Sequence, residues 1–266
     1  VPYLWKSPYA MFRSVTMHNL TFVSPSDCTE NHIRSSYKNF PGFDKSLFST
    51  IHNPLVSDVF DLESTVSIKP RTFIYPACWE RGGDIALRVF HKLSYDDGEF
   101  HSFSYKSHQT REHMHKSCNK TVLKSTLDMC DYMLYPLVSD GYIHKDTFAC
   151  VIAEALATRT IVITLKTACI PEVYKDHVVY VDMDIPEEFK IEFDSMKSEV
   201  RRDVSEYCSS DAVVDKFVDT IQMLEAHPAQ KERIRIKGQS FARSAFSSKN
   251  IGAQWHLLLQ SLDSKQ

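Results

Sequence analysis

The sequence has no long apolar run, no excess of positive charge and no paired cysteines, and each absence excludes a class of protein. Its longest apolar segments are shorter than the roughly 18 to 20 residues that a membrane-spanning helix needs. The first residues, VPYLWKSPYAMF, lack the apolar core of a signal peptide. A formal net charge of -3 gives no broad basic field. We expect no transmembrane segment and no nucleic-acid partner, while peripheral membrane contact stays open.

Metal and nucleophile motifs are also scarce. The seven cysteines are scattered, with no C-x-x-C pair, which favours reduced thiols and a cytoplasmic location. Neither G-x-S-x-G nor a Walker loop nor G-x-G-x-x-G occurs. Metal-competent side chains form two clusters, His108, His113, His115 and Cys118, and Asp182 with Asp184. The His and Cys cluster matches no standard zinc spacing, so a polar surface loop is the better interpretation. The pair Asp182 and Asp184 could bind a divalent metal, but a loop that leads into a helix explains it equally well. We expect no metal.

What the chain does contain is the composition and alternation of an α/β protein. Its 266 residues are 43% hydrophobic and 24% charged, enough for a substantial core. Alternating strand-like and helix-like segments predict a parallel sheet flanked by helices. The predicted strands span 20–23, 48–52, 71–77, 99–105, 132–137, 160–164 and 177–181, and the predicted helices 28–37, 84–93, 121–129 and 211–225. A polar stretch at 56–70 is the expected boundary between residues 1–56 and 57–266.

Three turns are expected to meet at the carboxyl ends of these strands, where parallel sheets bind ligands. The first turn contains Arg81 and Gly82. A guanidinium group suits phosphate oxygens, and glycine lets backbone amides approach a ligand. A tight turn with a solvated arginine is the alternative interpretation.

The second turn leads into a helix predicted to open at Asp146 or Thr147. The first amides of that helix, those of Thr147 and Phe148 among them, would be free donors at the positive end of its dipole. Asp146 could accept hydrogen bonds from sugar hydroxyls, and Glu154, two turns later, from both hydroxyls of a ribose. On spacing alone, an N-cap aspartate and a helix glutamate are the simpler interpretation.

The third turn consists of Lys166, Thr167, Ala168 and Cys169. It precedes Ile170-Pro171-Glu172, where proline suits the first turn of a helix. A second helix N-terminus would then point at the same edge, and Lys166 could add a positive charge for a phosphate. A plain connection between a strand and a helix is the alternative.

Two runs resemble a known family. DTFACVIAEALATRTIVITLKTACIPEVY resembles the signature of retaining GT-B glycosyltransferases of family 4, which is E-x7-E, then A-(M/L)-A-x-G-x-P-V, then G-(I/V)-P-E. FIYPACWERGGDIALRVFHKL resembles the first strand, turn and helix of that family's donor-binding domain. The sequence departs from the signature where Asp146 replaces the first glutamate and where Ala149 and Arg159 replace glycines.

The resemblance implies a GT-B-like fold with a Rossmann-like sheet and a shortened N-terminal α/β part in residues 1–56. It implies that Arg81, followed by Gly82, contacts a diphosphate. Asp146 would contact the donor sugar, and Glu154 would bind the ribose. Backbone amides would complete the donor site, from Thr147, Phe148, Thr167, Ala168 and Cys169.

The expected function is therefore transfer of a sugar from a UDP- or GDP-sugar to a hydroxyl of a glycan or another glycoconjugate. By analogy with the family, the reaction would be retaining and independent of metal. Arg81 and Asp146 would carry catalysis, mainly by electrostatic stabilisation of the departing diphosphate and by orienting the sugar. Two alternatives stay open: a nucleotide-sugar epimerase of the same fold, and a non-catalytic nucleotide- or sugar-binding module.

Overall fold

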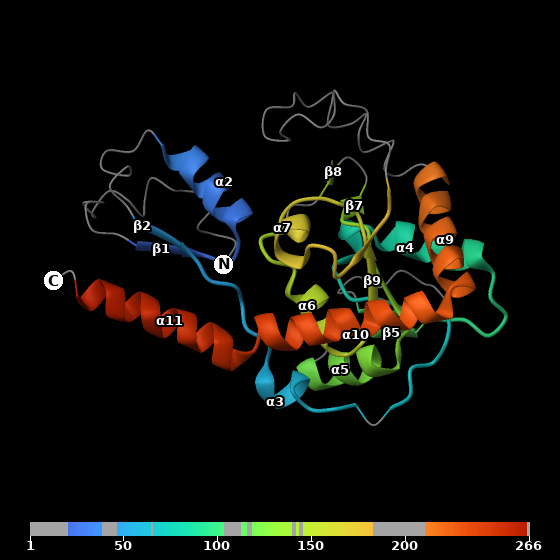
Figure 1. The fold of residues 1–266 in the computed structure, drawn as a ribbon. Helices are drawn as coiled ribbons and strands as arrows, with labels where there is room; N and C mark the ends of the chain where they lie inside the picture. The colour runs from blue at the N-terminus through green and yellow to red at the C-terminus, as the bar shows by residue number, and fades with distance from the viewer. Residues whose placement is uncertain are drawn as a thin grey trace.

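The computed structural model describes residues 21–38, 47–64, 66–103, 113–115, 119–139, 142–143, 146–182 and 211–264. They form a six-stranded parallel sheet with helices on both faces and, beside it, a smaller unit built on a two-stranded parallel sheet (Figure 1). The predicted α/β class with a parallel sheet is confirmed. No helix in the described residues is long and apolar enough to cross a membrane.

The large sheet has the strand order β10-β9-β6-β3-β4-β5. Its strands are β3 (Thr72–Tyr75), β4 (Glu99–Phe103), β5 (His113–His115), β6 (Tyr132–Tyr135), β9 (Ile161–Thr164) and β10 (Val179–Tyr180). The chain builds from β3 to β5 in one direction, then returns to the other side of β3 as β6 and continues to β10. The connections therefore diverge between β3 and β6, which is where such sheets open a crevice at their carboxyl ends.

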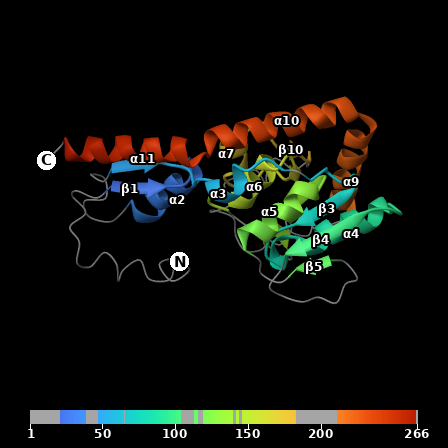
Figure 2. The same cartoon turned by 90° about the horizontal axis from the view of Figure 1, so that it is seen from below.

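Side chains of the central strands alternate between two cores because successive residues of a strand point to opposite faces. Phe73 and Tyr75 lie in one core and Ile74 in the other, and all three are fully buried. One face is covered by α4 (Gly83–Leu93) and α9 (Asp211–Ala226), and the other by α5 (Lys120–Met129), α6 (Cys150–Ala157) and α10 (Pro228–Ala245). Figure 2 shows the strands between these two groups of helices. Burial on both faces explains why the central strands β3, β6 and β9 are almost continuously apolar.

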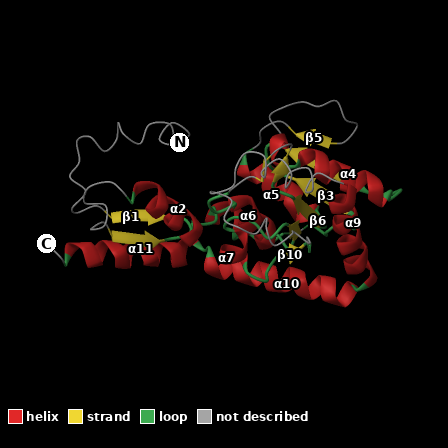
Figure 3. Ribbon diagram, turned by 90° about the horizontal axis from the view of Figure 1, so that it is seen from above, coloured by secondary structure: helices red, strands yellow, loops and turns green. Residues whose placement is uncertain are grey.

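The smaller unit consists of β1 (Thr21–Ser24), α2 (Asp27–Tyr37) and β2 (Leu47–Thr50). Its connection to the large sheet passes through a single helical turn, α3 (Ser57–Phe60), in the stretch for which the sequence predicts irregular structure. Phe60 is fully buried in the core beneath α5, which explains the turn. The C-terminal helix α11 (Ser248–Asp263) returns to lie alongside β1 and β2 (Figure 3).

Glu172 ties the smaller unit to the large one. This residue lies on α7 (Ile170–Tyr174), and its carboxylate accepts the amides of Asp27 and Cys28, both at 2.7 Å. Those amides belong to the first turn of α2, where helical amides have no partner within the helix. A carboxylate at this end also interacts favourably with the helix dipole. The carboxyl edge of the large sheet therefore faces the smaller unit.

Residues other than glycine fill most left-handed backbone positions of the described chain, which as a whole contains only seven glycines. They are Arg71, Ser94, Leu137, Ala149, Arg159, Ala168 and Lys175. Ala149 (φ 55°) precedes α6 and Arg159 (φ 67°) follows it, at the positions where the signature has glycine. The backbone thus keeps a glycine-type conformation without glycine, at a cost of about 1–2 kcal/mol per residue.

Candidate functional site

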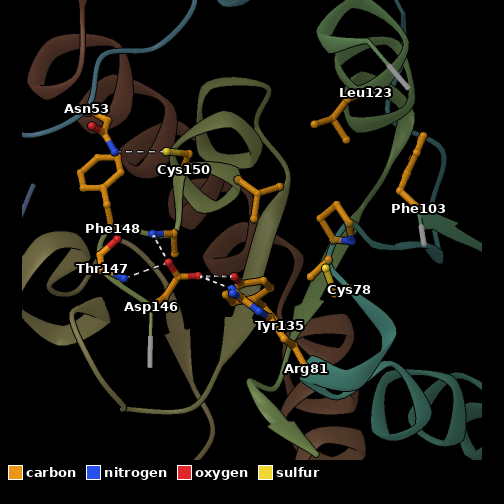
Figure 4. A pocket seen from close by; sticks show the side chains of 14 residues that line it. Asn53, Cys78, Arg81, Phe103, Leu123, Tyr135, Asp146, Thr147, Phe148 and Cys150 are labelled. Carbon is orange, nitrogen blue, oxygen red and sulfur yellow. Dashed lines mark hydrogen bonds and ion pairs between the residues drawn. The ribbon is translucent and has the colours of Figure 1, made fainter. Parts of the chain in front are cut away.

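A cavity of ≈ 390 Å³ opens at the carboxyl ends of β3, β4 and β6, where the connections that follow the paired strands β3 and β6 run in opposite directions (Figure 4). Its size falls within the range of about 300–1,000 Å³ that is usual for small-molecule sites. The cavity is lined by Asn53, Pro76, Ala77, Cys78, Arg81, Phe103, Leu123, Tyr135, Asp146, Thr147, Phe148, Ala149, Cys150 and Val151. The structure therefore brings Arg81, Asp146, Thr147 and Phe148 together, from two of the three expected turns.

The cavity has a charged end and an apolar end. Arg81 and Asp146 lie together at one side in Figure 4, and Phe103 and Leu123 lie at the other. Phe103 ends β4 and Leu123 belongs to α5, so different elements build the two ends. The charged end holds the Arg81–Asp146 ion pair, and the apolar end offers the side chains of Phe103 and Leu123.

The backbone after β3 places Arg81 in the cavity. Residues Trp79–Arg81 form a 3-10 turn, and Gly82 ends it with φ 109°, a conformation that favours glycine. Arg81 is 37% exposed at its side chain, and its Nη1 donates to Asp146 Oδ2 at 3.0 Å. Partial burial acts to lower the pKa of Arg81, but Asp146 and Tyr135 raise it above the usual value, so the guanidinium stays charged.

Asp146 is held by four donors. Its Oδ1 accepts the amides of Thr147 at 2.9 Å and Ala149 at 3.2 Å. Its Oδ2 accepts Arg81 and the hydroxyl of Tyr135, the latter at 2.8 Å. A carboxylate offers about four acceptor positions, so this set fills the group.

The expected start of the helix at Asp146 or Thr147 is wrong, because α6 begins at Cys150. The left-handed Ala149 separates the helix from the residues before it. The amide of Thr147, expected to be a free donor, bonds instead to Asp146. Asp146 therefore organises the turn before the helix and does not cap the helix itself.

Glu154 lies behind the cavity on α6, one turn after the lining residue Cys150, and is 4% exposed. Lys120 Nζ donates to its Oε1 at 2.5 Å, whereas Oε2 is buried and has no hydrogen-bond partner among the residues that the structure describes. Burial raises the pKa of Glu154, and Lys120 opposes this shift. An unpaired buried oxygen is costly and is suited to accept a hydrogen bond from a ligand.

The third expected turn takes no part in lining this cavity. None of the residues 166–169 is among the lining residues. Lys166 is exposed and Cys169 is buried, and the amide of Thr167 donates to the carbonyl of Leu165 at 3.0 Å. The short helix α7 that follows instead presents Glu172 to α2.

Sequence reasoning missed three residues of the site. Tyr135 lies inside the predicted strand 132–137 and reads as a core residue, and no motif marks it. Lys120 opens α5 and pairs with Glu154, and no motif marks it. Asn53, from the connection after β2, donates to Cys150 Sγ at 3.5 Å and brings the smaller unit to the cavity.

Within the described residues, no group of three or more His, Cys, Asp or Glu side chains could hold a metal ion. Asp182 is exposed, and Asp184, His108 and Cys118 lie outside the described residues. None of the cysteines that the structure describes forms a disulfide, which agrees with the reduced thiols that the sequence predicts; they are Cys28, Cys78, Cys130, Cys150 and Cys169.

The sequence matches no protein-family model and no curated protein sequence. Solved structures do resemble the fold. The pneumococcal O-GlcNAc transferase GtfA, in complex with UDP and GlcNAc, matches with a TM-score of 0.61 at 13% identity, over 91% of this chain and 45% of that one. HepE from Anabaena, in complex with UDP and glucose, matches with a TM-score of 0.60 at 12% identity, over 90% and 62% of the two chains.

A glycosyltransferase from Rickettsia africae matches with a TM-score of 0.60 at 14% identity, over 97% of this chain and 67% of that one. The chain thus spans between 45% and 67% of the length of these three structures. Identities this low show the fold alone. The described residues have an α/β fold that matches glycosyltransferases of the GT-B type.

Proposed function

We propose that the chain binds the donor of a glycosyltransferase reaction, in which a sugar passes from a nucleotide diphosphate-sugar to a hydroxyl acceptor. The observation that carries the proposal is the cavity at the carboxyl ends of β3 and β6, with the Arg81–Asp146 ion pair at one end and apolar side chains at the other. A GT-B-like fold supports it, since GtfA and HepE were solved with UDP.

The two ends of the cavity set the direction in which such a donor would lie. Its diphosphate would approach Arg81, and its base would lie toward Phe103 and Leu123. Glu154, which lies behind the lining residue Cys150, would accept a ribose hydroxyl through its buried Oε2, with Lys120 holding the other oxygen. Asp146 would contact the sugar. The contribution expected from residues 166–169 stays a prediction.

The chemistry asked of these residues is mainly electrostatic. Arg81 would stabilise the negative charge that develops on the departing diphosphate in a site partly shielded from water. A retaining outcome and independence of metal are further parts of the proposal. Transfer in the presence of EDTA, with the anomeric configuration of the product read by NMR, tests both parts.

Calorimetry with UDP and GDP tests the donor site. We expect binding to the wild type by at least one nucleotide, and a loss of about tenfold or more in Arg81→Ala, because a charge-assisted hydrogen bond is removed. Glu154→Ala should weaken binding as well. Arg88→Ala is the matched control, since Arg88 lies on the surface of α4 and pairs with Asp211. Equal affinities in the wild type and in both site variants would refute the assignment.

Incubation with the sugar donor that binds distinguishes transfer from its alternatives. Turnover that requires a hydroxyl acceptor supports a transferase. Epimerisation of the donor without an acceptor would support an epimerase, and binding without any turnover would support a non-catalytic module.

A further inference from the structure

The Asp146 carboxylate has no acceptor position left for a ligand. The amides of Thr147 and Ala149 occupy Oδ1. Arg81 and Tyr135 occupy Oδ2. If Asp146 is to accept a hydrogen bond from a sugar hydroxyl, one of these four donors has to leave, because a carboxylate offers about four positions.

The four donors differ in how freely they can leave. The amides of Thr147 and Ala149 belong to the same turn as Asp146 and move with it. Tyr135 ends a central strand and is 2% exposed. Arg81 has a long side chain that is 37% exposed and stands on a 3-10 turn. Arg81 is therefore the donor that exchanges.

We propose that Tyr135 is a positioning residue of the donor site and that it holds Asp146 in place when the diphosphate of a nucleotide sugar draws Arg81 away. The exchange frees one position on Oδ2, which then accepts a hydroxyl of the sugar. This inference rests on the proposed function, since it needs a ligand that carries both a diphosphate and a sugar.

The chemistry of Tyr135 suits this role. Burial and the neighbouring Asp146 raise the pKa of Tyr135 well above its usual value, so its hydroxyl remains a donor at neutral pH. Its bond to the carboxylate, at 2.8 Å, belongs to the stronger, charge-assisted class. No covalent bond changes: Arg81 donates to phosphate oxygens in place of Asp146, and the sugar hydroxyl donates to Asp146 in place of Arg81.

The first test separates the sugar from the nucleotide. Calorimetry with UDP and UDP-glucose, and with GDP and GDP-glucose, gives the ratio between the affinities for the sugar conjugate and for the nucleotide. Tyr135→Phe should lower this ratio by about tenfold, the loss expected for a hydrogen bond to a charged group. If Tyr135 has only a structural role, Tyr135→Phe should lower the affinities for the nucleotide and for the sugar conjugate equally, and that result would overturn the proposal.

The matched control lies on the same strand. The Tyr132 hydroxyl is also buried and donates to Glu225 at the opposite edge of the sheet. Tyr132→Phe therefore removes the same group at a similar cost in stability, and it should leave the ratio unchanged. A fall in the ratio as large as that of Tyr135→Phe would overturn the proposal.

The second test addresses the exchange itself. Asp146→Asn should tighten nucleotide binding several-fold, because Arg81 no longer has to leave a carboxylate. The gain should vanish in the Arg81→Ala background, as a double-mutant cycle measures. A gain that persists without Arg81 would reflect only the removal of a nearby negative charge, and it would overturn the exchange.

The two proposals fail in different ways. If neither UDP nor GDP binds the wild type, the proposed function falls and the inference falls with it. If a nucleotide binds but Tyr135→Phe leaves the sugar ratio unchanged and Asp146→Asn gives no gain, only the inference is overturned.

Discussion

The large sheet has a paired aspartate at each end of its strands, at the amino edge, where the strands begin, and at the carboxyl edge, where they end. At the amino edge, Asp131 is 0% exposed and accepts Lys231 at 2.7 Å, the amide of Arg71 at 3.0 Å, and Arg235. At the carboxyl edge, the side chain of Asp146 is 17% exposed and also has a full set of donors. Each carboxylate is paired, but Asp146 itself lines a cavity, whereas at the amino edge Arg235 and not Asp131 lines one.

The difference lies in the cations. The side chains of Lys231 and Arg235 are 10% and 11% exposed, and both come from α10, which packs over the amino edge. Arg81 is 37% exposed and stands on a short turn. Water or a ligand can therefore replace Arg81 at modest cost, whereas separating the amino-edge pairs leaves charges buried. The packing around an ion pair thus determines whether a ligand can replace one of its partners.

The largest expected effect comes from breaking the amino-edge network. Asp131→Asn should lower the free energy of unfolding by up to about 3–5 kcal/mol, because the buried Lys231 and Arg235 lose the carboxylate that they share and keep only Glu225 and Glu232 as charged partners. Urea denaturation measures the change. Asp97→Asn, at an exposed pair with Arg71, should cost less than about 1 kcal/mol. Equal losses in Asp131→Asn and Asp146→Asn would contradict the contrast between the edges.

A smaller effect concerns the pH dependence of the free energy of unfolding, to which Glu154 contributes at the carboxyl edge. Burial raises the pKa of Glu154 above its ordinary value of 4.5, so the native state holds the proton more tightly than the unfolded chain. The stability that Glu154 contributes is fully present below its pKa in the unfolded chain. This contribution is lost as the pH rises through its higher pKa in the folded protein. Glu154→Gln removes this dependence and should be more stable than the wild type at pH 7, by up to about 1 kcal/mol.

Thermal unfolding of the wild type and Glu154→Gln between pH 4 and pH 8 measures that difference. Nucleotide affinity should change in the opposite direction, rising with pH as Glu154 ionises, since the carboxylate is the better acceptor for a ribose hydroxyl. Parallel pH profiles of stability in the two proteins would show that Glu154 carries no such linkage.

The smallest effect compares the two ends of α6, which lie at the two edges. Ala149→Gly relieves a left-handed alanine but adds freedom to the unfolded chain, so we expect a gain of no more than about 1 kcal/mol. Arg159→Gly relieves the same kind of conformation but removes the ion pair with Glu232, so its gain should be smaller. Chemical denaturation of the two variants side by side provides the measurement. A loss of stability in Ala149→Gly would show that the position needs its side chain.

Much of the fold could be predicted from local patterns. The strand at Tyr132 shows the limit: its apolar run extends to Leu137, but the strand ends at Tyr135, where Pro136 follows without an amide hydrogen and Leu137 adopts a left-handed conformation. Likewise the helix pattern reaches Asp146, while Ala149 delays its start to Cys150. Backbone conformations of this kind are usually signalled by glycine, and this chain adopts them without it.

The candidate site could be predicted where its residues lie in turns after strands. Arg81 and Asp146 were expected at the carboxyl edge, and in the structure Arg81 Nη1 lies 3.0 Å from Asp146 Oδ2. Their mutual pairing could not be foreseen, because it joins residues that lie 65 positions apart. Tyr135 and Lys120 gave no sequence signal, since each acts only through a partner that the fold places beside it.

The sequence by itself determined the alternation of strands and helices, since burial on both faces of a parallel sheet demands apolar strands and amphipathic helices. It also determined which turns carry charge. Tertiary structure alone decided that a cavity forms at the carboxyl ends of β3 and β6, that four donors fill the Asp146 carboxylate, and that one oxygen of Glu154 has no partner among the described residues. These properties depend on distances between segments remote in sequence, which local propensity does not encode.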